Sequence, residues 1–152
     1  MVVPPHSRRA TWQRVELLRH LRAPTVDEAK MESEWVLPRT AAASIGLFVT
    51  IEKPFPPASR EAVAVYQDAF GRMDLPMMYV WVPGGGFGGS LIRSLMTGIT
   101  HLSGNATRVK VTGQLSSAVD ALATAFGDGE PGRGLYDAVE SLRLDSMEQL
   151  TG

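Results

Sequence analysis

The residues with the clearest capacity for chemistry are the glycines at positions 84–89. Gly84, Gly86 and Gly89 match the spacing G-x-G-x-x-G, which marks a dinucleotide-binding turn when it lies between a strand and a helix. The apolar run 77–82 before them is typical of a buried strand, and the apolar residues of 91–102 recur at helical spacing. Free backbone N–H groups at the start of such a helix can bind an anion. The sequence therefore predicts a contact loop here, formed by Gly84, Gly85, Gly86, Phe87, Gly88, Gly89, Ser90 and Arg93.

Three interpretations of this loop remain open: a turn that lets the helix pack closely on the sheet, an anion site, or a nucleotide site. A nucleotide site needs an acidic residue after the next strand, to bind a ribose hydroxyl. The predicted strand 108–112 instead ends in Thr112 and Gly113. Phe87 stands between glycines, which offer little side chain to cover it, so it is predicted to be an exposed anchor for a partner.

Other catalytic or metal-binding chemistry has little support in the sequence. His6, His20 and His101 are far apart and show no ligand spacing, so each is predicted to lie on the surface or to be partly packed. Glu28 and Glu32 are like charges one helical turn apart, which favours a solvated face. The chain has no cysteine nucleophile, and no serine lies in a nucleophile elbow. We therefore expect a protein that is not an enzyme and that carries no cofactor and no metal.

Composition bounds the class of protein. A chain of 152 residues is long enough for one domain with a sizeable core. The absence of cysteine excludes disulfides and thiolate metal sites, and predicts a cytoplasmic setting. The net charge of −1 gives no general attraction for nucleic acid or anionic membrane. No apolar run is long enough for a transmembrane segment, and the N-terminus has no apolar core of signal-peptide type.

The predicted elements alternate along the chain. Residues 1–11 are predicted to be a mobile arm, and 12–22 fits a strand or a helix, with a strand preferred at 14–21. Thr25 and Glu28 form a capping box, so a helix should start there and end before Pro38. Strands at 44–52, 77–82 and 108–112 then alternate with helices, and the last helix turns four apolar residues inward: Leu115, Val119, Leu122 and Phe126.

This alternation predicts an α/β fold with a mostly parallel sheet of four strands, or five, and helices packed on its faces. The domain is expected to span residues 12–126. A glycine-rich hinge at 127–134 and a C-terminal amphipathic helix at 135–152 would follow. That helix either covers the domain or meets a partner.

The segments GLFVTIEKPFPPASREAVAVYQ, MMYVWV, GGSLIRSLMTGITHL and TRVKVTGQLSSAVDALATAF resemble the small bacterial STAS-like proteins. These are relatives of anti-sigma-factor antagonists, and their sheet is similar to that of CRAL-TRIO lipid-binding domains. The resemblance covers roughly residues 14–126 and is a pattern of elements. It implies a non-enzymatic regulatory or binding domain that acts through a protein partner or a small apolar ligand.

The resemblance also implies a phosphorylatable serine at the start of the helix after a central strand, usually with an acidic residue just before it. Ser59 is the candidate for phosphorylation, although Ala58 stands in the place of the acidic residue. The alternative for Ser59 is a simple helix cap. Two alternatives for the whole protein remain: a phosphate- or nucleotide-binding protein that uses the loop 84–89, and a structural subunit that forms homodimers through its C-terminal helix.

Overall fold

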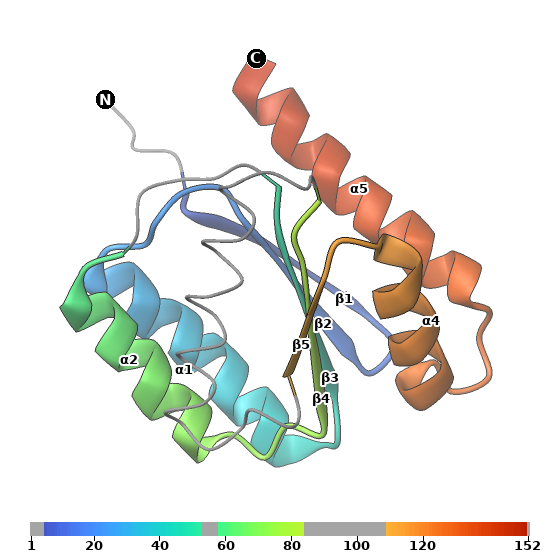
Figure 1. The fold of residues 1–152 in the computed structure, drawn as a ribbon, viewed down its shortest axis with the longest axis horizontal. Coiled ribbons are helices and arrows are strands. Elements are labelled where there is room, and N and C mark those ends of the chain that lie inside the picture. The colour runs from blue at the N-terminus through green and yellow to red at the C-terminus, as the bar shows by residue number, and fades with distance from the viewer. Residues whose placement is uncertain (1–4, 53–57, 84–108, 152) are drawn as a thin grey trace.

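The computed structural model describes residues 5–52, 58–83 and 109–151, and the side chains of these up to residue 144. Its five strands form one sheet in the order β1-β2-β3-β4-β5 (Figure 1). The strands are β1 (Ser7–Trp12), β2 (Val15–His20), β3 (Gly46–Ile51), β4 (Met77–Trp81) and β5 (Val109–Thr112). β1 pairs antiparallel with β2, and all other neighbours are parallel. The predicted α/β class and the parallel order of the three later strands are thus confirmed.

Helices cover both faces of the sheet (Figure 1). α1 (Val26–Ala42) and α2 (Arg60–Arg72) lie on one face, and α4 (Leu115–Phe126) and α5 (Gly132–Thr151) lie on the other. The central strand β3 is buried along its whole length. Its side chains alternate between two apolar cores, with Leu47 and Val49 facing α1 and α2 and Phe48 facing α4 and α5.

The prediction of a mobile arm at residues 1–11 was wrong for Ser7 onward. These residues form β1, which makes a tight hairpin with β2 and pairs Trp12 with Val15. The turn between them gave no sequence signal, because Gln13 takes a positive φ of 51° where glycine, asparagine or aspartate is usual. The preferred strand at 14–21 is confirmed as β2.

α1 also runs further than predicted, because it continues through Pro38 to Ala42. Proline removes one backbone hydrogen bond from a helix interior. Side chains in the same turn bind nearby carbonyl oxygens, since Arg39 Nη1 donates to Trp35 O at 2.6 Å and Thr40 Oγ1 donates to Leu37 O at 2.8 Å. Thr40 is buried, so tertiary packing also holds this end of the helix.

α5 covers the domain. Its Leu135, Val139 and Leu142 are buried in the same core as Val119 and Leu122 of α4. This part of the apolar face is therefore occupied within the chain, which removes it as a contact surface for a second copy.

The glycine loop 84–90, Arg93 and the predicted helix 91–102 lie outside the described residues. Those predictions remain untested. Among the helices that the structure describes, none has an apolar stretch long enough to cross a bilayer.

One prediction concerns the close approach of α4 to β3. A Cβ atom at Gly46 would lie 2.7 Å from a ring carbon of Phe126 and 2.8 Å from a methyl carbon of Leu122. Gly46→Ala should therefore lower the free energy of unfolding by about 1–3 kcal/mol, as overpacking of a core does.

The control is Gly71→Ala, because Gly71 lies in α2 with no atom within 4 Å of the added Cβ. That change should raise the free energy by about 0.5–1 kcal/mol. Urea unfolding measures both, and equal effects would contradict the packing argument.

Candidate functional site

Two histidines come together at the carboxyl end of β2. His20 is the last residue of β2, and the hairpin register puts Ser7 directly opposite it. His6 precedes Ser7, and its carbonyl oxygen accepts a hydrogen bond of 2.7 Å from the backbone N–H of Leu21. These backbone contacts fix the two imidazole rings with their centroids 5.8 Å apart.

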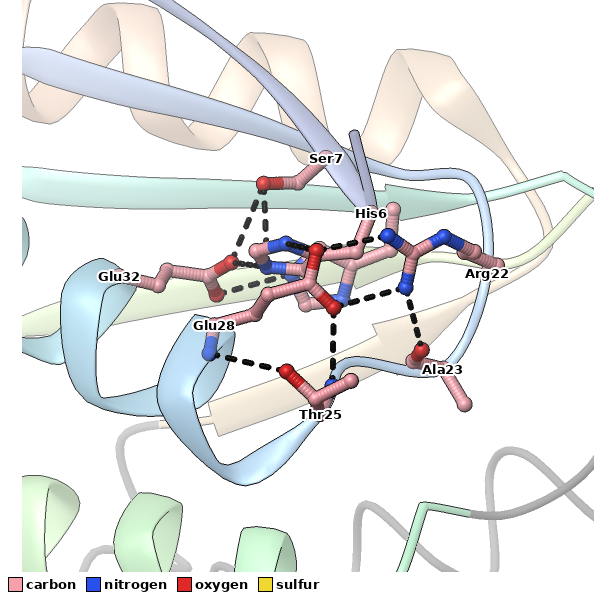
Figure 2. Close-up of polar contacts among 8 residues, drawn as sticks. His6, Ser7, Arg22, Ala23, Thr25, Glu28 and Glu32 are labelled. Atoms are coloured by element: carbon pink, nitrogen blue, oxygen red, sulfur yellow. Dashed lines mark hydrogen bonds and ion pairs between the residues drawn. The ribbon is translucent and has the colours of Figure 1, made fainter. Parts of the chain in front are cut away.

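Glu32 of α1 contacts both histidines, and Figure 2 shows its side chain beside His6. The capping box at Thr25 and Glu28 sets the start of α1, and from there Ala29, Glu32 and Val36 fall on the side that faces the sheet. The Glu32 side chain is only 5% exposed. Its Oε2 lies 2.5 Å from His6 Nε2, and its Oε1 lies 2.9 Å from His20 Nε2. One buried carboxylate thus accepts hydrogen bonds from two imidazoles.

A further set of contacts orients His6 (Figure 2). Its second ring nitrogen, Nδ1, lies 3.6 Å from Oε2 of Glu28. Arg22 donates to both oxygens of Glu28, at 2.7 and 2.6 Å, and the backbone N–H of Thr25 donates to Glu28 Oε1 at 3.0 Å. Ser7 Oγ donates to Glu32 Oε2 at 3.2 Å. Both ring nitrogens of His6 therefore face carboxylates that are themselves held in place.

Tyr66 of α2 lies beside His20. Its ring centroid is 6.4 Å from that of His20. The hydroxyl oxygen is buried. Burial raises the pKa of this phenol, and the charge of Glu32, a hydrogen bond to Glu32 and the charge of Glu28 raise it further. Tyr66 is therefore a neutral O–H group beside the two histidines.

Opposite charges within the site favour the ionised forms of Glu32 and His20. Burial by itself would raise the pKa of Glu32, but the charge of His20 and hydrogen bonds from both histidines hold that pKa well below its usual range. Burial would lower the pKa of His20, yet the adjacent Glu32 carboxylate raises it. The hydrogen bonds from Arg22 lower the pKa of Glu28 to about 2. The site thus holds two ionised carboxylates near neutral pH, with imidazole nitrogens turned toward them.

A second polar group, on the opposite face, has a structural role. Arg19 of β2 forms an ion pair with Glu52 at 2.7 Å and donates to the backbone oxygen of Arg143 at 2.7 Å. Arg143 of α5 pairs with Glu52 in turn and packs over the ring of Trp81 at 5.3 Å. These contacts fasten α5 to the sheet.

The structure contradicts two interpretations made from the sequence. His6 and His20 are neighbours rather than isolated, and Glu32 is buried rather than solvated. The sequence contained only part of the information needed to predict these two contacts. The hairpin that brings the histidines together turns at Gln13 without a usual turn residue, and Glu32 shares the inward stripe of α1 with Ala29 and Val36.

Ser59 caps α2, the helix that follows the central strand β3. Its Oγ accepts a hydrogen bond of 3.2 Å from the backbone N–H of Ala62, and the residue is exposed. Ser59 therefore acts as the N-cap of α2, and its phosphorylation stays a prediction.

Comparisons with known proteins add no relative from which a role could be transferred. No protein-family model, curated protein or solved structure matches this chain.

Proposed function

We propose that this chain is a non-enzymatic, STAS-like regulatory domain that acts by binding a protein partner. The observation that carries the proposal is the position of Ser59. It is exposed at the N-terminus of α2, the helix that follows the central strand of a sheet with four parallel strands. The resemblance implies a phosphorylatable serine at that position. A cytoplasmic setting, which the lack of cysteine favours, belongs to the same proposal.

The N-terminus of α2 is chemically suited to a switch. A phosphate there would bring about −1.5 to −2 charges to free N–H groups at the positive end of the helix dipole. The exposed Arg60 follows Ser59 and offers a cation. The modification would therefore change the charge of an exposed helix end while the fold stays intact, which is how a partner could distinguish the two states.

The test is phosphorylation of the full chain. Purified protein incubated with ATP and an extract of its source organism should gain one phosphate, and tandem mass spectrometry should assign it to Ser59. The Ser59→Ala variant should gain none. A chain that stays unmodified, or one that is modified equally in the variant, would overturn the proposal.

The stability effect of the same variants is a separate prediction. Ser59→Ala removes the cap of α2 and should lower the free energy of unfolding by about 1 kcal/mol. Ser59→Asp keeps an acceptor at the N-cap and should stay close to the wild type. Urea unfolding measures both changes. A Ser59→Asp variant as unstable as Ser59→Ala would show that the side-chain cap contributes nothing here.

The alternative of a phosphate- or nucleotide-binding protein depends on the loop 84–89, and the absorbance ratio at 260 and 280 nm of the purified protein tests it. A small apolar ligand in place of a protein partner would appear in mass spectrometry of the native protein. Homodimer formation through α5 is disfavoured, because Leu135, Val139 and Leu142 are already buried within the chain.

A further inference from the structure

We propose that His6, His20 and Glu32 form a binding site for one divalent first-row transition metal ion, such as Zn²⁺. This inference is independent of the regulatory role proposed above. It starts from the donor atoms, because each of the three residues offers one ligand atom to the same small region. All three ligand atoms lie within 4.8 Å of one another.

The geometry fits a metal after a small adjustment. A tetrahedral ion with bonds of about 2.0–2.1 Å keeps its ligand atoms about 3.3 Å apart. Here the Glu32 oxygens lie 2.5 Å from the His6 nitrogen and 2.9 Å from the His20 nitrogen. The hydrogen bonds keep the Glu32 oxygens and the histidine nitrogens slightly closer together than they would be as ligands of one metal ion. An incoming ion would therefore replace the shared protons and widen the two Glu32–histidine distances by less than 1 Å, and it would gather ligand atoms that already lie within 4.8 Å of one another.

The surroundings are those of a metal site. Histidine ligands usually direct their second ring nitrogen to a carboxylate, which fixes the ring and makes it more basic. Nδ1 of His6 faces Glu28 in this way at an ion-pair distance of 3.6 Å, and Arg22 and Thr25 hold Glu28 in place. His20 ends β2, Glu32 belongs to the capped helix α1, and His6 directly precedes β1 and is held by the backbone hydrogen bond from Leu21, so the three positions are fixed before any ion arrives.

Tyr66 adds a neutral hydroxyl group beside the cluster. Its ring centroid lies 6.4 Å from that of His20, and Glu32 acts on its buried hydroxyl both as a charge and as a hydrogen-bond acceptor. Three protein ligands leave at least one coordination position on the ion for water.

The choice of ligands selects the class of metal. Calcium and magnesium prefer sites made of oxygen atoms, whereas imidazole favours zinc, iron, nickel and copper. Two imidazoles with one carboxylate match the second group. Thiolates cannot contribute, because the chain contains no cysteine. The set is also one ligand short of a closed structural zinc site, so the fourth position is open to solvent or an exogenous ligand.

The test uses the full-length, tag-free chain after removal of metal with EDTA. Titration with Zn²⁺ in the presence of a competing indicator should show saturable uptake of one ion per chain. Nitrogen-15 NMR of the histidine rings should show shifts of Nε2 in His6 and His20 on adding Zn²⁺. His101, the third histidine of the chain, should not shift. This measurement needs no variant and is therefore unaffected by folding defects.

Variants then assign the ligands. Glu28→Gln should weaken Zn²⁺ binding by about 10–100-fold, as loss of a carboxylate behind a ligating histidine does. Glu32→Gln and His20→Gln should weaken it further, and His101→Gln should leave it unchanged. Circular dichroism confirms that each variant is folded. The proposal is overturned if no ion binds in a one-to-one ratio, if the His101 ring shifts in place of the other two, or if folded Glu32→Gln binds as the wild type does.

Discussion

Leu135→Ala is expected to cost about 2–5 kcal/mol of the free energy of unfolding, the usual range for a fully buried leucine. Leu135 lies at the start of α5 and is completely buried against α4 and the sheet. The loss is a large fraction of the 5–15 kcal/mol typical of a whole domain. For a chain of this length it should lower the melting temperature by about 5–15 °C. Thermal unfolding followed by circular dichroism measures it.

The matched control is Leu144→Ala in the same helix. Leu144 is 56% exposed, so the substitution should change the free energy of unfolding by no more than about 0.5 kcal/mol. Equal melting temperatures for the two variants would show that α5 is not part of the core. A loss in Leu135→Ala alone would establish the helix as an integral layer of the domain.

The second large effect is the dependence of stability on pH in the metal-free protein. Glu28 and Glu32 have pKa values below their ordinary 4.5, so the stability they contribute is present above pH 4.5 and is lost as the pH falls toward 2. His20 has a pKa above its ordinary 6.5, so its contribution is present below pH 6.5 and is lost as the pH rises through the raised value. The free energy of unfolding should therefore be highest between pH 4.5 and 6.5.

Glu32→Gln tests the origin of this profile. The charged or titratable groups around Glu32 are His6, His20, Glu28, Arg22 and Tyr66, and the charge of Glu32 raises the pKa of His20. Removing the charge should lower the free energy of unfolding at pH 6 by about 3–5 kcal/mol, because it breaks a buried ion pair. It should also reduce the dependence of the free energy of unfolding on pH, both below pH 4.5 and above pH 6.5.

Urea unfolding in EDTA between pH 3 and 9 is the measurement. Glu34→Gln, an exposed change two residues away in the same helix, is the control and should follow the wild-type curve. If Glu32→Gln follows that curve too, the cluster does not govern the pH dependence.

Local patterns in the sequence were enough for most of the fold. The capping box at Thr25 and Glu28 set the start of α1, and continuous apolar runs marked β3 and β4 as strands covered on both faces. These signals are reliable because helix caps and buried strands depend on residues that are adjacent in the chain. Parallel order followed from connections too long for hairpins.

Only the tertiary structure decided the candidate metal site. His6 and His20 become neighbours through the register of a hairpin whose turn has no usual turn residue. Glu32 reaches the two histidines only because α1 packs on the face of the sheet to which their side chains point. A carboxylate on a helix is solvated or buried according to what packs against it, and that depends on chain segments far apart in sequence. The amino-acid sequence by itself therefore predicted most of the described elements, with β1 and the end of α1 as exceptions, whereas the packing of β1, β2 and α1 determined which ionisable residues meet.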